Sequence, residues 1–263
     1  MLTGPRCERR LLVFLVTLLL ISIGYGAQRT ASATREDRVT IRPRRVVLVR
    51  TGEHARQFPE RSRAIVVYPE VLGLKDSRVL MRVRSILQIK NVFGSSLAEY
   101  QDDGWLTDFS YKINHNRNYI LDITFTQSGM GAYPDEQSKH ILINLKNGRL
   151  IKALDAFASN KFETLAAMID RKLQQEIKQI EDENANDLDP QAKEWSKAAH
   201  ESLKFEIQNL DDFSVGRKGI TFLYDAGFPH AIKAFEPQGK YFFTYSELKP
   251  YIKRDGLLGQ FAD

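Results

Sequence analysis

From Leu106 the hydrophobic period changes to two, which restricts this part of the chain to β-structure. Phe109, Tyr111 and Ile113 alternate with polar residues, and the same alternation continues through Leu121, Ile123 and Phe125. The turn residues Asn116-Arg117-Asn118 interrupt the first run and predict a hairpin with the second run, Tyr119–Thr126. A third strand is expected at Lys139–Leu145, before the turn signal Asn147-Gly148. These runs together predict an antiparallel β-sheet with one apolar face.

Helical periodicity flanks the predicted strands. Asp76 or Ser77 is expected to cap a helix in which apolar residues recur at spacings of three and four. A longer apolar stripe predicts a second helix from about Lys161 to Glu181, and strands return between residues 213 and 245. The predicted fold class is therefore α+β, an antiparallel β-sheet with helices packed on one face, preceded by an N-terminal signal segment.

Residues 1–26 have the order of a secretory signal. Three arginines precede the apolar run Leu11–Ile23, and small residues follow at Gly24, Gly26 and Ala27. This run is shorter than the roughly 20 apolar residues of a spanning helix, which favours a cleaved signal peptide over an uncleaved signal anchor. Both alternatives predict an extracytoplasmic protein, either periplasmic or secreted, or tethered to the membrane through Leu11–Ile23.

The net charge of +5 is concentrated near the front of the chain. Residues 29–90 hold 15 Lys and Arg against 6 Asp and Glu, whereas residues 91–263 hold 20 against 26. A nucleic-acid-binding protein would carry its basic excess on the folded domain, so no nucleic-acid partner is expected. Residues 27–61 are interpreted as a basic, mostly extended linker that includes a candidate strand at Arg45–Val49, and residues 62–263 as the folded domain.

No pattern in the sequence identifies a catalytic residue, a metal site or a cofactor site. The single cysteine, Cys7, precedes the apolar run, which excludes thiol nucleophiles and cysteine-based metal sites from the domain. The five histidines lack metal-ligand spacing, and Ser95-Ser96 lacks the glycine of a nucleophile elbow. The prediction is therefore a non-enzyme without metal or cofactor. The alternative is a cell-wall polymer-modifying enzyme that uses carboxylates such as Asp108, Asp122 or Asp135.

The order of several turns and strand ends is similar to that of a known family. The segments that carry the likeness are Tyr68-Pro69, Asp103-Gly104, Ile141–Leu145, Asp155-Ala156-Phe157 and Gly219–Phe222. Their order resembles the extracytoplasmic domain of the anti-sigma factor RsiV, also found ahead of the catalytic domain of the peptidoglycan deacetylase PdaC. The resemblance covers roughly residues 62–252 and implies an RsiV-like α+β domain that binds a lysozyme-like protein or a wall component.

Two loops are the candidate ligand-binding elements. Where many members of this family have a Gly-Gly-Ala-His loop, this chain has Gly129–Pro134, so a role of that histidine does not transfer. Tyr133 offers a rigid aromatic face with a hydroxyl group, Pro134 fixes the backbone and Asp135 supplies charge. Phe228-Pro229-His230 forms a second aromatic loop. The predicted function is an envelope domain that binds a protein or a cell-wall glycan without catalysis.

Overall fold

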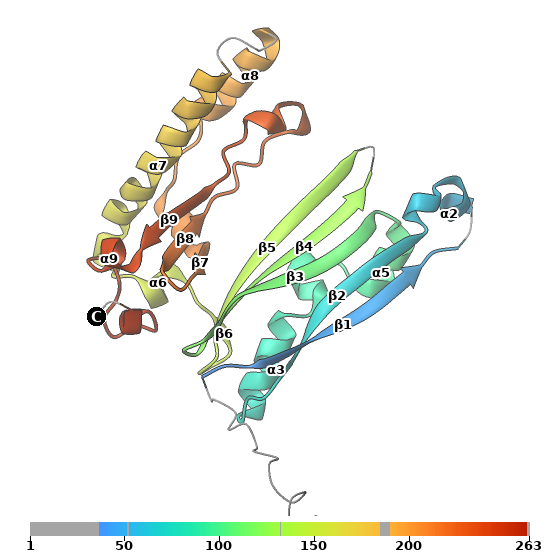
Figure 1. Cartoon of the computed structure of the whole chain (residues 1–263), viewed down its shortest axis with the longest axis horizontal. Helices are drawn as coiled ribbons and strands as arrows, with labels where there is room; N and C mark the ends of the chain where they lie inside the picture. The colour runs from blue at the N-terminus through green and yellow to red at the C-terminus, as the bar shows by residue number, and fades with distance from the viewer. Residues whose placement is uncertain (1–36, 52, 132, 185–189, 262–263) are drawn as a thin grey trace, which may run out of the picture. The chain divides into compact units, whose positions relative to one another are not determined.

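The protein is α+β, as the sequence predicts, and contains two β-sheets. The structure is a computed structural model that describes residues 37–51, 53–131, 133–184 and 190–261 (Figure 1). Within these residues one sheet has six strands in the order β1-β2-β3-β4-β5-β6, and the other has three in the order β7-β8-β9. The predicted signal segment, residues 1–26, lies outside the described residues.

The six-stranded sheet is not purely antiparallel. All neighbouring strands run antiparallel except β2 and β3, which are parallel and are joined through a helical connection. The parallel pair was not predicted, because the strand runs themselves carry no signal for direction. The strands are β1 (Thr40–Val49), β2 (Arg63–Leu72), β3 (Leu106–Arg117), β4 (Ile120–Met130), β5 (Pro134–Asn144) and β6 (Arg149–Leu150).

Strand β1 corrects the predicted linker. The sheet begins at Thr40, well before Ser62, and β1 pairs with β2 along its whole length. Val46 lies opposite Val66, and Leu48, which lies opposite Ala64, is only 7% exposed. The arginines that suggested a solvated linker occupy the exposed positions of an edge strand.

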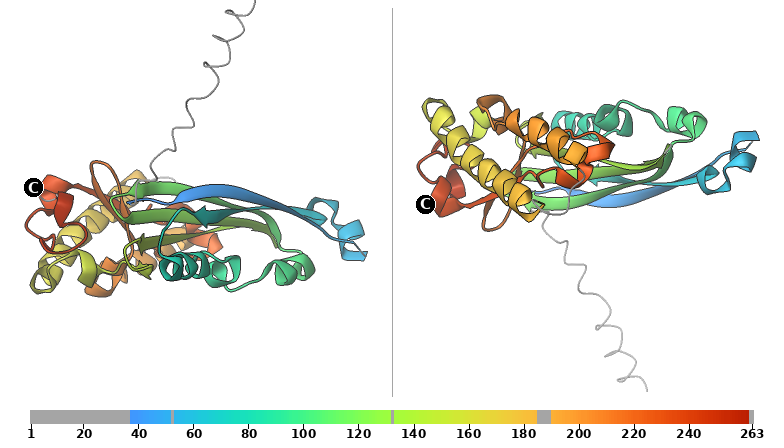
Figure 2. Two further views of the ribbon diagram at one scale, coloured as in Figure 1. Left: turned by 90° about the horizontal axis from the view of Figure 1, so that it is seen from below. Right: turned by 90° about the horizontal axis from the view of Figure 1, so that it is seen from above.

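Three helices cover one face of the six-stranded sheet, namely α3 (Ser77–Ile86), α4 (Ile89–Phe93) and α5 (Leu97–Asp103) (Figure 2). Of the two predicted caps, Asp76 and Ser77, it is Asp76 that caps α3. Its side chain accepts hydrogen bonds from the backbone N–H groups of Arg78 and Val79 at 2.8 and 3.1 Å. Val79 and Val83 are buried against the strands. The connection from β2 to β3 therefore also supplies the cover of the apolar face.

A second layer is formed by the long helix α7 (Phe162–Glu183) and the three-stranded sheet. Five residues of the predicted apolar stripe are buried there: Leu165, Ala166, Ile169, Leu173 and Ile177. This sheet consists of β7 (Phe213–Val215), β8 (Gly219–Leu223) and β9 (Lys240–Thr244). The remaining elements are α2 (Glu53–Gln57), α6 (Ala153–Ala156), α8 (Pro190–Glu201), α9 (Tyr245–Leu248), η1 (Pro59–Arg61), η2 (Ser159–Lys161), η3 (Ile207–Asp211), η4 (His230–Phe235) and η5 (Gly259–Phe261).

In the part of the chain that the structure describes, no helix has the length and apolar character needed to cross a membrane.

The tip of the β4–β5 hairpin rests on Trp105. A Cβ atom at Gly129 would lie 2.2 Å from the indole ring, whereas one at Gly131 would meet no atom closer than 3.8 Å. Gly129→Ala is therefore expected to cost about 1–3 kcal/mol of unfolding free energy, because the indole has to shift. Gly131→Ala is the matched control and should change stability by less than about 0.5 kcal/mol. Urea denaturation of both variants measures the difference, and equal midpoints would contradict this packing.

Candidate functional site

A groove of about 1390 Å³ opens between the polar face of β3–β5 and the outer face of the three-stranded sheet. Its size exceeds the roughly 300–1000 Å³ of a typical small-molecule pocket, which suits a segment of a polymer better than a metabolite. Polar and charged side chains make up most of its walls. Examples are Lys112, Thr124, Thr126 and Ser138 from the six-stranded sheet, and Thr221 and Lys240 from the three-stranded sheet.

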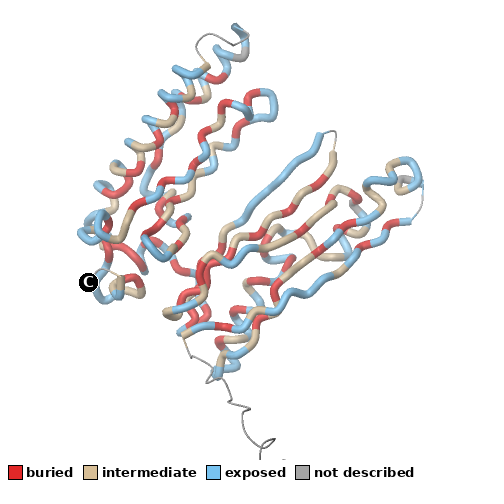
Figure 3. The backbone as a smooth tube through the Cα atoms, in the orientation of Figure 1, coloured by how far each residue is buried: buried red, intermediate tan, exposed pale blue. Residues whose placement is uncertain are grey.

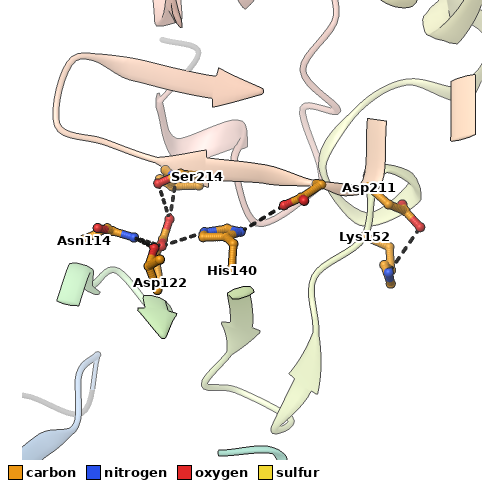
Figure 4. Close-up of polar contacts among 9 residues, drawn as sticks. Asn114, Asp122, His140, Lys152, Asp211 and Ser214 are labelled. Atoms are coloured by element: carbon orange, nitrogen blue, oxygen red, sulfur yellow. Dashed lines mark hydrogen bonds and ion pairs between the residues drawn. The ribbon is translucent and has the colours of Figure 1, made fainter. Parts of the chain in front are cut away.

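A buried carboxylate, Asp122 on β4, connects the two sheets beside this groove. Its Oδ1 accepts hydrogen bonds from Asn114 Nδ2 at 2.7 Å and His140 Nε2 at 2.8 Å. Its Oδ2 accepts from Ser214 Oγ at 2.9 Å and from the backbone N–H of Val215 at 2.6 Å (Figure 4). Asp122 is fully buried, so these four donors replace its hydration.

His140 on β5 lies between two carboxylates. Its Nε2 faces Asp122, and its Nδ1 is 3.3 Å from Asp212 Oδ1. Burial alone lowers the pKa of His140, but the hydrogen bonds and negative charges of Asp122 and Asp212 outweigh burial and raise the pKa to about 9. The imidazole is therefore protonated at neutral pH, where each ring nitrogen donates to one carboxylate.

The network around Asp122 extends to the surface near η3. Asp211 accepts a hydrogen bond from the backbone N–H of Ala153 at 2.8 Å and lies 3.3 Å from Lys152 Nζ (Figure 4). This pair fixes the start of α6 beside β7. Asn114, His140, Asp212 and Ser214 all line the groove, so the network holds one wall against the other.

Two of the predicted binding residues meet in space. The rings of Tyr133 and His230 are stacked, with centroids 4.9 Å apart and an angle of 25° between their planes. Tyr133 lies at the tip of the β4–β5 hairpin and is 65% exposed, and His230 is the exposed first residue of η4. This aromatic pair joins the two predicted loops next to the groove.

The other three predicted residues have different surroundings. Asp135 is exposed on β5 and lines the groove. Pro134 begins β5, opposite Met130, and does not line the groove. Phe228 borders the groove but is only 7% exposed, because it packs with Ile232 and Phe235. Phe228 therefore contributes mainly to packing.

The three candidate catalytic carboxylates do not form a pair. Asp108 is opposite Ser128 on β4, and Asp135 is opposite Gly129, so their side chains point to opposite faces of the sheet. Asp122 lies six residues from Ser128 along β4, about 20 Å away. Glycosidase carboxylates lie about 5–9.5 Å apart. Within the described residues no group of three His, Cys, Asp or Glu side chains is arranged to hold a metal ion.

No local pattern in the sequence pairs His140 with Asp212. His140 stands in an alternating strand, where a polar residue is ordinary, and Asp212 follows 72 positions later in an irregular segment. The sequence feature that could have indicated this network is Asp122, a carboxylate in a central strand with apolar neighbours on both sides. Such a position requires buried donors from another part of the chain.

Fold and site together define an α+β domain with a polar groove between a six-stranded and a three-stranded sheet. No protein-family model matches the chain, and no curated protein matches it. Among the solved structures that share the fold are two described as DUF3298 family proteins. One, from Bacteroides fragilis, has 12% identity and a TM-score of 0.54, and the match covers 86% of this chain and 98% of the other.

The second, from Pseudomonas aeruginosa PAO1, has 13% identity and a TM-score of 0.52, covering 83% of this chain and 96% of the other. At these identities the likeness shows the fold alone. The chain therefore has the fold of DUF3298 proteins. The narrower resemblance to the domains of RsiV and PdaC stays a prediction.

Proposed function

We propose that the chain is an exported or membrane-anchored envelope protein whose folded domain binds a protein or a cell-wall glycan in the groove, without catalysis. The observation that carries the proposal is the groove of about 1390 Å³, large enough for a polymer segment and lined by donors and acceptors. The leader with Leu11–Ile23 supports an extracytoplasmic location, either periplasmic or secreted.

Charge in the groove favours recognition of a mixed polar surface. Lys112, Lys139 and Lys240 provide positive charge, and Asp135 and Glu136 provide negative charge. A groove with both positive and negative charges does not select a polyanion such as nucleic acid, because binding of a polyanion requires an excess of basic residues. The stacked Tyr133 and His230 add an exposed aromatic surface of the kind that packs on sugar rings and on protein side chains.

The proposal is tested by measuring retention of two probes, a lysozyme and soluble peptidoglycan fragments, on the purified protein. Thr126→Trp places an indole inside the groove and is expected to weaken binding of the retained probe at least tenfold. Thr164→Trp is the matched control, because Thr164 is exposed on α7, does not line the groove and should leave binding unchanged.

Two results would contradict the proposal. If neither probe is retained, the proposed binding function is wrong. If both tryptophan variants bind the retained probe equally well, the groove is not the binding site. The peptidoglycan fragments should also keep their mass after incubation with the protein. New cleavage or deacetylation products would instead favour the enzymatic alternative.

A further inference from the structure

The outer edge of β5 is open along most of its length. On one side, β5 pairs with β4 from Pro134 to Asn144. On the other side, β6 pairs only with Ile143 and Asn144. The backbone N–H of Ile151 donates a hydrogen bond to the carbonyl of Leu142 at 2.9 Å. Figure 3 shows the exposed outer part of this strand, which runs along the groove.

The direction of the backbone groups follows from two hydrogen bonds at the end of this strand. The backbone N–H of Leu145 donates to Tyr119 on the β4 side, whereas the carbonyl of Leu142 accepts on the β6 side. Because backbone groups alternate along a strand, the even positions Glu136, Ser138 and His140 direct N–H and C=O away from β4. Among the described residues no hydrogen bond to these outer groups is formed.

The opposite edge of the same sheet is protected in a way that this edge is not. On β1 an arginine-rich segment contains Pro43, which has no N–H to offer. On β5 the donors and acceptors of Glu136, Ser138 and His140 repeat about every 7 Å. Residues of α4, from Lys90 to Phe93, line the groove on one side of this edge, and β7 and β8 line it on the other.

We propose that β5 takes an extended polypeptide segment of a partner protein as an additional strand, paired with Glu136, Ser138 and His140. This inference rests on the proposed binding function and names its ligand class. An extended peptide presents N–H and C=O groups at the required repeat, whereas the hydroxyl groups of a glycan do not. The small hydroxyl side chain of Ser138, on the strand to be paired, leaves room for the side chains of the added strand and favours polar ones.

The central test compares two substitutions at one position. Ser138→Pro removes the outward N–H without removing a bond to β4, so the fold is expected to persist. Ser138→Ala keeps this N–H and removes only the hydroxyl group. Linear 12-residue peptides selected from a phage-displayed library on the purified protein should bind the wild type and Ser138→Ala alike. They should bind Ser138→Pro at least tenfold more weakly.

Hydrogen exchange on the wild type provides a readout that does not depend on folding of the proline variant. A bound peptide should slow exchange at the amides of Glu136, Ser138 and His140. The exchange rates of the Gln137 and Lys139 amides should not change, because these amides face β4. Failure to select any linear peptide, equal binding to both variants, or unprotected outer amides would overturn the inference.

The two proposals fail separately. If peptidoglycan fragments are retained and Ser138→Pro binds them as well as the wild type does, the groove binds its ligand but the added-strand inference is wrong. If the protein is a dimer in sedimentation experiments and Ser138→Pro makes it a monomer, the occupant is a second copy of the chain and not a partner protein. This result would also overturn the inference.

Discussion

Asp122→Ala is expected to lower the free energy of unfolding by about 3–5 kcal/mol, the usual cost of removing one partner from a buried charged pair. The substitution leaves four donors without their acceptor, on Asn114, His140, Ser214 and Val215. It also leaves protonated His140 without its fully buried counter-charge. Chemical denaturation in urea at pH 7 measures the loss directly.

Asp255→Ala is the matched control, since Asp255 is an exposed aspartate near the C-terminus. A change within about 0.5 kcal/mol is expected there. A loss below about 1 kcal/mol for Asp122→Ala would show that Asp122 does not hold the two sheets together. Because Ser214 and Val215 belong to β7, the variant should also expose the groove walls to faster hydrogen exchange.

Stability is expected to fall as pH rises through about 9, because His140 has a higher pKa in the folded protein than in the unfolded chain. With an unfolded pKa near 6.5, the protonated imidazole contributes its full stabilisation below that pH. This stabilisation decreases above pH 6.5 and is lost once the folded protein also releases the proton. The shift from 6.5 to about 9 corresponds to roughly 3 kcal/mol.

His140→Gln isolates this effect, because glutamine keeps a hydrogen-bond donor near Asp122 but does not titrate. Unfolding free energies at pH 6, 7.5 and 9 should decrease for the wild type by more than they do for the variant. Other groups that titrate in this range, such as lysines, are common to both proteins and cancel in the difference. Parallel pH profiles would contradict a raised pKa at His140.

Local patterns were sufficient for elements whose signal lies within the element. Alternation predicted β3 and most of β4, the stripe with Leu165 and Ile169 predicted α7, and Asp76 was one of two predicted caps. The third strand was predicted only from Lys139, whereas β5 begins at Pro134. Strand β1 was obscured because its exposed positions carry arginine, which resembles a solvated linker. The composition of this segment does not show that it forms an edge strand, because the position of a strand in a sheet depends on the whole fold.

The site itself depends on contacts between distant parts of the chain. Asp122 and Ser214 are 92 positions apart, and no local pattern relates them. Tyr133 and His230 were each predicted from their loops, but their stacking depends on how the hairpin tip meets η4. Phe228, an aromatic residue with apolar neighbours at Ile232 and Phe235, had a local signal for burial, as Asp122 had.

The short length of β6 has a consequence for the groove. In the register that pairs Ile143 with Leu150, a continued strand would bring Ala153 opposite His140 and Ala158 opposite Asp135. Instead, the Asp155 carboxylate accepts a hydrogen bond from the backbone N–H of Lys152 at 2.9 Å, a helix starts at Ala153, and the chain is diverted. The start of this helix thus keeps the domain from pairing the outer edge of β5 with its own chain. A redesigned, longer β6 would occupy that edge.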